Sequence, residues 1–404
     1  MRSCLVGLLA ACAGLASAEP LLLDRLREKI ANDLERLPAY RCRETVERTS
    51  VDGSVSHPLA TLRFDVAQVG GKEVVSWPGE HRFSEKSIEM MASYLGAISF
   101  GEFALQLRNL FEPGVATFSA PVEEARDGRQ TIRWDFKAPR EKSRFQVGGP
   151  GGTAAVAYHG SVSVDPQTLD LMRLEIAVDD IPEGLGIASH RSVVEYSRVR
   201  IGTADFVLPA VANLEAQGSH VSLKSRLTYA ACGPFGAPKS TPRPEMLPPG
   251  MMLDAEVDVP IELDKGAIGD PFSVALSRAV KKGPDIQLAK GTRLTGRITR
   301  LDKRSTFFGN VKTAYYTIGL ELDGAKTAEG KEWEMCTTLE AARSIGNRYF
   351  VPFSQVLERG MTLWQQMENS VERPPACEGL LLSVADKSEI GRGVRLHFAT
   401  AKPK

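Results

Sequence analysis

Apolar residues recur with a helical spacing soon after the start of the chain. Leucine and isoleucine follow one another at intervals of three and four from Leu21 to Leu37, and Pro38 comes next. This spacing places the apolar side chains on one stripe of a helix, which the proline then ends. Further helices are predicted on the same grounds at residues 84–94, 99–110 and 354–371.

Most of the remaining chain alternates between apolar and polar residues with a period of two. Leu62, Phe64 and Val66, for example, alternate with Arg63 and Asp65. Such alternation is typical of strands with one buried and one solvated face. The pattern recurs at 132–136, 161–164, 171–178, 193–199, 221–229, 253–259, 272–277, 293–301, 314–322, 332–339 and 394–398. We therefore expect a mainly β protein with a few helices, of the α+β class.

A proline-rich segment divides the chain. Six of the 18 residues from Gly233 to Gly250 are proline, which cannot donate a backbone hydrogen bond to a helix or a sheet. We predict a linker at 236–250, with one domain at 19–235 and another at 251–404. The many short strands of the second domain, separated by glycines, favour a small β-barrel or a sandwich.

The N-terminus has the pattern of a secretory signal peptide over residues 1–18. Arg2 precedes an apolar run that is too short to span a bilayer, and Ala16-Ser17-Ala18 supplies small residues for cleavage. A second interpretation stays open, because the residues ending at Cys12 resemble a bacterial lipobox, in which that cysteine would carry lipid. Either interpretation predicts an exported protein, periplasmic or at the cell surface.

Four cysteines remain after the leader is removed, and an even number in an exported chain favours disulfides. Two lie in each half, so we predict the pairs Cys42–Cys232 and Cys336–Cys377. None belongs to a C-x-x-C motif, which argues against zinc binding or redox chemistry.

The order of elements in the first half resembles the lipoprotein-carrier fold, which is LolA-like and is shared by RseB-like envelope-stress regulators. One amphipathic helix is followed by alternating strands with two helices inserted early. The resemblance implies an open antiparallel half-barrel whose mouth is covered by helices. Short motifs in this half also resemble a group of uncharacterised secreted bacterial proteins: Leu37-Pro38-x-Tyr40-x-Cys42, Trp77-Pro78-Gly79, Tyr158-His159-Gly160, Asp165-Pro166, Asp180-Ile181-Pro182 and Val194-Glu195-Tyr196.

The second half is similar to the β-barrel domain of conjugation-type (type IV) secretion core proteins. The likeness rests on Pro249-Gly250, on Gly269-Asp270 and on the segment from Leu288 to Arg297, although Ala289-Lys290 stands where that family has Ile-Pro. It implies an interaction domain.

Sequence motifs for catalysis are sparse. No nucleophile elbow, H-E-x-x-H motif, Walker A motif or helix-opening Gly-x-Gly-x-x-Gly is present. We therefore expect a non-enzymatic protein with no cofactor and no metal. A hydrolase that uses His159 with Asp165 or Asp180 is the alternative that the histidines allow.

The charge balance argues against one class of partner. Fifty basic residues balance fifty acidic ones, so no global field attracts nucleic acid, and we expect no nucleic-acid partner. Because no hydrophobic run beyond the leader reaches the length of a membrane span, we also expect no transmembrane span in the mature chain.

A half-barrel with an apolar face needs cover from helices, lipid or protein. The hypothesis is therefore an envelope protein that binds an acyl chain, a lipoprotein or an apolar partner surface. The alternative is a structural or assembly factor that binds an envelope protein and has no ligand cavity. Candidate lining residues are Phe64, Val66, Trp77, Phe103, Trp134 and Phe136.

Overall fold

The computed structural model describes residues 18–70, 72–80, 83, 103–149, 152–218, 222–236, 244–283, 286–308, 311–343, 349–352, 377, 379–384 and 389–402. Over these residues the protein is mainly β with a few helices, as predicted. The helices predicted at 84–94 and 354–371 lie outside the described residues.

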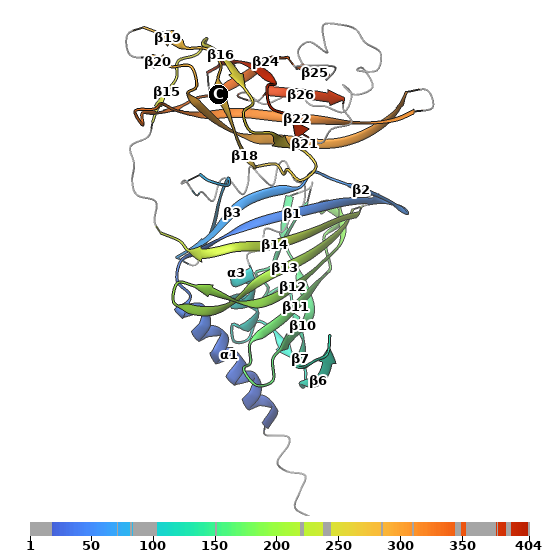
Figure 1. The fold of residues 1–404 in the computed structure, drawn as a ribbon. Helices are drawn as coiled ribbons and strands as arrows, with labels where there is room; N and C mark the ends of the chain where they lie inside the picture. The colour runs from blue at the N-terminus through green and yellow to red at the C-terminus, as the bar shows by residue number, and fades with distance from the viewer. Residues whose placement is uncertain are drawn as a thin grey trace, which may run out of the picture.

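The first sheet contains twelve strands and curls around two helices (Figure 1). All its pairings are antiparallel, in the order β4-β3-β1-β14-β13-β12-β11-β10-β7-β5, with β2 beside β1 and β6 beside β7. The strands are β1 (Tyr40–Asp52), β2 (Val55–Pro58), β3 (Leu62–Val69), β4 (Lys72–Ser76), β5 (Thr117–Phe118), β6 (Val122–Arg126), β7 (Arg129–Ala138), β10 (Ala157–Val164), β11 (Leu171–Asp179), β12 (Ile187–Ile201), β13 (Ala204–Gly218) and β14 (Ser222–Pro234).

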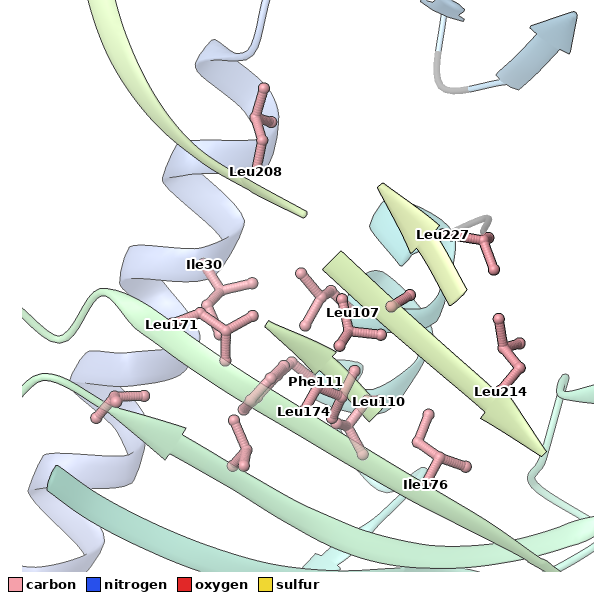
Figure 2. Packing of buried hydrophobic residues seen from close by; sticks show 14 of the residues in the cluster. Ile30, Leu107, Leu110, Phe111, Leu171, Leu174, Ile176, Leu208, Leu214 and Leu227 are labelled. Carbon is pink, nitrogen blue, oxygen red and sulfur yellow. The ribbon is translucent and has the colours of Figure 1, made fainter. Parts of the chain in front are cut away.

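Two helices occupy the inside of the curl, α1 (Ala18–Arg36) and α3 (Phe103–Phe111), both close to their predicted positions. Leu26 and Ile30 of α1 are buried, which confirms the apolar stripe. Figure 2 shows Ile30 beside Leu171 of β11. The rest of this half is a hairpin of β8 (Gln146–Gly149) and β9 (Gly152–Ala155) and a 3-10 turn, η1 (Glu183–Leu185).

The second sheet contains ten strands and has its own hydrophobic core. Its order is β15-β23-β22-β21-β18-β16-β28-β24, with β26 paired to β22 and β25 to β26. The strands are β15 (Glu245–Met246), β16 (Met252–Glu256), β18 (Pro271–Leu276), β21 (Arg293–Phe308), β22 (Val311–Lys326), β23 (Glu332–Glu334), β24 (Thr337–Arg343), β25 (Tyr349–Pro352), β26 (Gly379–Val384) and β28 (Arg395–Thr400). Two separate two-stranded sheets lie in the same half. They pair β17 (Ile261–Glu262) with β27 (Glu389–Ile390), and β19 (Val280–Lys282) with β20 (Ile286–Leu288).

Strand β24, at one end of this second sheet, lies against β26, which pairs with β22. A Cβ on Gly379 of β26 would lie 2.1 Å from the Cβ of Leu339 in β24, so only glycine permits this approach. The sheet therefore curls back on itself.

Both predicted cysteine pairs are disulfides in the structure. Cys42 in β1 is bonded to Cys232 in β14, and Cys336 before β24 is bonded to Cys377 before β26. The first bond joins two paired strands in the middle of the first sheet, and the second joins the segments that precede β24 and β26. In the loop-entropy model, bridging residues 190 and 41 positions apart stabilises the fold by about 5 and about 4 kcal/mol, respectively.

The two sheets touch through the segment before β18. The backbone N–H of Arg63 in β3 donates to the carbonyl of Ile268 at 2.8 Å, and Ile268 donates to Thr61 at 2.8 Å. The guanidinium of Arg63 also binds the carboxylate of Asp270, with Nη1 2.6 Å from Oδ1. This contact is a short parallel bridge with an ion pair beside it.

A second arginine completes this junction. Arg297 of β21 binds Glu80 from the first half and Asp323 and Glu321 from the second, and its guanidinium lies 5.8 Å from the centre of the Trp77 ring. Burial opposes the charge of Arg297, but the three carboxylates outweigh it and raise the pKa of Arg297. The charge therefore stays on Arg297 and holds residues from both sheets together.

Gly269 provides a test of this junction. Its φ is +97°, and a Cβ there would lie 2.1 Å from the Arg63 carbonyl and 2.6 Å from the Trp77 ring. We expect G269A to lower the free energy of unfolding by about 1–3 kcal/mol more than G250A, in urea titrations followed by fluorescence. Gly250 is the matched control because its φ is +84° and its Cβ would meet no atom within 4 Å. Equal losses in the two variants would contradict the described contact.

Candidate functional site

Four of the six candidate lining residues lie in the core enclosed by the first sheet. Phe64, Val66, Trp134 and Phe136 are all buried there. Phe103 belongs to α3, but its side chain lies outside the described part of the structure.

Trp77 occupies a different place from the other candidates. It is partly buried, and its ring lies at the junction of the two sheets, against Arg297 and Gly269. Its contact with Arg297 depends on a residue 220 positions away, which no local pattern around Trp77 could indicate.

Two small cavities lie beneath the helices, one on each side of a shared wall. Each has a volume of about 40 Å³, which suits one water-sized group. Leu34 and Leu37 at the end of α1, Leu107 of α3 and Val207 of β13 line both cavities. Figure 2 shows Leu107 between α3 and the strands below it. The two cavities therefore have four apolar lining residues in common.

The first cavity has a polar wall. Beyond the shared leucines it is lined by Cys42, Val66, Leu208, Pro209 and a group of polar side chains: Tyr40, Gln68, Glu73, Tyr196 and Tyr229. Gln68 donates from Nε2 to Oε2 of Glu73 at 3.0 Å. The second cavity is lined mainly by apolar residues, with Lys29 and Asp33 paired at its edge. One end of the interior is therefore rich in hydrogen-bond acceptors and the other is apolar.

Glu44 lies behind the polar wall, and it is the least expected residue of the core. It is 1% exposed, it belongs to β1, and it faces inward between Cys42 and Val46. Burial raises its pKa well above 4.5, the charge of Glu73 adds to the increase, and a hydrogen bond from Tyr229 opposes it. Its Oε1 atom has no hydrogen-bond partner among the described residues. Burial therefore favours the protonated form of Glu44.

The tyrosines of the wall are also buried. Burial raises the pKa of Tyr40, and Glu73 raises it further. Burial likewise raises the pKa of Tyr196, whose hydroxyl is buried and has no hydrogen-bond partner among the described residues. All the tyrosines here keep their protons and can donate as well as accept.

The histidine predicted for the hydrolase alternative has a different partner from the expected ones. Nδ1 of His159 lies 2.9 Å from the carboxylate of Asp179, its neighbour across the β10–β11 hairpin. Asp165 instead accepts backbone hydrogen bonds from Gln167 and Thr168 and shapes a turn. The pairing of His159 with Asp165 is therefore wrong. Asp180 follows Asp179 with a φ of +52° and begins the next turn.

His159 lies on the outer face of the first sheet. It borders an open groove of about 830 Å³ whose walls include Ser161. The groove also holds Arg133, Asp135, Glu175 and Arg191, of which Arg133 pairs with Asp135 and Arg191 with Glu175. No hydrogen bond from Ser161 to His159 is found among the described residues, so the arrangement lacks the contact that activates a nucleophile.

Within the described ranges, no group of three or more histidine, cysteine, aspartate or glutamate side chains is placed to hold a metal ion. None of the helices described is both long and apolar enough to cross a membrane.

Comparison with known proteins adds one structural likeness. No family model and no curated protein sequence matches the chain. The structure is similar to an outer membrane lipoprotein-sorting protein domain from Vibrio parahaemolyticus, with a TM-score of 0.29 and 11% sequence identity. The match covers 52% of this chain and 90% of that domain. At this TM-score the likeness carries no argument.

Glu44 gives a testable dependence of stability on pH. Because its pKa is raised in the folded state, the folded protein binds more protons than the unfolded chain above pH 4.5, and stability falls as the pH rises. We expect E44Q to remove that loss. Its free energy of unfolding should exceed that of the wild type by at least about 1 kcal/mol near pH 8.

The two proteins should differ much less near pH 4.5, and urea titrations at both pH values measure the difference. E47Q is the control, because Glu47 lies on the outward face of the same strand. A constant difference between E44Q and the wild type across the range would show that the Glu44 carboxyl does not titrate as described.

Proposed function

We propose that the protein is an exported, non-enzymatic envelope protein whose first domain, residues 19–235, binds an acyl chain beneath α1 and α3. The single observation that carries the proposal is the pair of cavities that share a wall of Leu34, Leu37, Leu107 and Val207. An apolar slot interrupted only by flexible side chains can become continuous when those side chains change rotamer.

The helices suit the role of a movable cover. The nine-residue α3 inserts Leu107, Leu110 and Phe111 into the curl of the sheet. It packs against α1, which is joined to the sheet at Tyr40 after a connection of only three residues. A chain entering from the second cavity would displace Leu107 toward the first, and α3 would shift outward to make room. The disulfide beside Val66 would keep the opposite wall fixed during this movement.

Two features support an exported location. The first eighteen residues have the pattern of a signal peptide, and four cysteines form two disulfides, which persist in oxidising compartments. The second domain, residues 251–404, would then be an interaction domain that meets an envelope partner protein.

A structural or assembly factor without a ligand is the second candidate function. The small size of the two cavities, about 40 Å³ each, favours it, because neither holds an acyl chain as it stands. The two candidates differ in whether the wall between the cavities opens.

Leu107 distinguishes the two candidates. We expect L107A to tighten the binding of dodecanol to the full mature chain at least about fivefold, because the removed atoms leave room for part of the alkyl chain. L107W should abolish binding by filling both spaces. Isothermal titration calorimetry measures both affinities, and displacement of a fluorescent fatty acid gives an independent reading.

Leu110 supplies the matched control, since it is buried on the same helix and lines neither of the two cavities. L107A and L110A should both lower the free energy of unfolding by about 2–5 kcal/mol. A difference between them in dodecanol affinity would therefore come from the cavity that Leu107 lines and not from lost stability. If neither the wild type nor L107A binds dodecanol, the carrier proposal fails and the assembly role is favoured.

The mature N-terminus is a further prediction. Cleavage after Ala18 leaves Glu19 and Pro20 in the first turn of α1, where proline is well accommodated. We expect the intact mass of the exported protein to match a chain that begins at Glu19. C12A should leave that mass unchanged, whereas A16L/A18L should block processing. A mature chain with an acylated Cys12 would overturn this prediction and support the lipobox.

A further inference from the structure

The polar wall of the first cavity has no role in holding an alkyl chain. Tyr40, Gln68, Glu73, Tyr196 and Tyr229 gather at one end of an interior that is otherwise lined by leucine, valine and phenylalanine. Polar groups in such surroundings cost free energy unless they are satisfied. Oε1 of Glu44 and the hydroxyl of Tyr196 are both buried without a hydrogen-bond partner among the described residues. These two atoms indicate that the described residues leave a hydrogen-bonding site unfilled.

The charge of this wall indicates what would fill it. The residues that line the cavity include one carboxylate, Glu73, and no lysine, arginine or histidine. Glu44, a second carboxyl group, lies directly behind Tyr229 and interacts with Glu73. A ligand group that donates several hydrogen bonds and carries a positive charge would compensate both carboxyl groups, whereas a carboxylate or phosphate would be repelled.

We propose that this cavity is a head-group site for a primary amine, so that the ligand of the first domain is an amphiphile with an ammonium group at one end and an alkyl chain at the other. The proposal rests on the acyl-chain function above and specifies the polar end of the ligand. An ammonium group has three donors, and Glu73, Tyr196 and the Oε1 atom of Gln68 offer acceptors around one small space. The volume of about 40 Å³ suits such a group without its chain.

The two cavities suit the two ends of such a ligand, the ammonium group and the alkyl chain. The ammonium group would occupy the polar cavity, and the first carbons of the chain would cross the wall at Leu107 and Val207 into the apolar cavity. Binding of the ligand should also change the protonation of Glu44. Burial and Glu73 raise the pKa of the Glu44 carboxyl in the free protein. A positive charge in the neighbouring cavity would lower that pKa, so Glu44 would release its proton to solvent as the ligand enters.

The test compares three amphiphiles with the same chain and different head groups, dodecylamine, dodecanol and dodecanoic acid. Isothermal titration calorimetry on the full mature chain at neutral pH should give at least tenfold tighter binding for dodecylamine than for dodecanoic acid. E44Q and Y196F should each reduce the preference for the amine to below threefold. Urea titrations followed by fluorescence show that both variants fold.

The proton balance provides a readout that a merely structural role of Glu44 would not change. Repeating the dodecylamine titration in buffers of different ionisation enthalpy should reveal proton release in the wild type and none in E44Q. E47Q, which alters the outward carboxyl of the same strand, should behave like the wild type in every titration.

The outcomes separate the two proposals. Equal binding of all three amphiphiles, or tightest binding of dodecanoic acid, would overturn the amine site and leave the acyl-chain function standing. Tight amine binding that E44Q and Y196F do not weaken would also overturn the site. Failure of all three to bind would overturn the acyl-chain function, and the amine site with it.

Discussion

The pairing of β1 with β14 is the constraint on which the first half of the molecule depends. These strands pair along eleven register positions, and the Cys42–Cys232 disulfide joins them covalently over a separation of 190 residues. The first and last strands of this half are therefore neighbours in mid-sheet. Apart from β8 and β9, the strands described between β1 and β14 in the sequence all belong to this one curled sheet, and α3 lies inside the curl.

The parts of the fold that the sequence predicts are those whose side chains alternate cleanly. The strand at Leu62–Val69 could be identified because apolar residues face the core at every second position. β1 was not identified, because Glu44 and Arg48 face inward where an apolar residue is expected. β13 was missed as well, since its register shifts opposite Glu195 and Tyr196 and many of its side chains are only half buried. The domain boundary at residues 236–250 stays a prediction.

The site was harder to predict than the strands. The aromatic candidates at Phe64, Trp134 and Phe136 were identified by their apolar character, and they form the core beneath the helices. The polar wall needs contacts between β1, β3, β4, β12 and β14, which no spacing along the chain reveals. The sequence does contain one usable signal, the carboxyl of Glu44 within an inward-facing alternation from Tyr40 to Val46. His159 shows the same limit, because its partner is set by the hairpin register and not by nearness in sequence.

The short strand β4 belongs to two parts of the molecule at once. Glu73, near its start, lines the polar cavity, while Trp77 and Glu80 just beyond its end hold Arg297 of the second sheet. An edge strand is hydrogen-bonded on one side only, so it yields more readily than the strands inside the sheet. One short segment thus contributes to the polar cavity of the first sheet and to the contact with Arg297 of the second sheet.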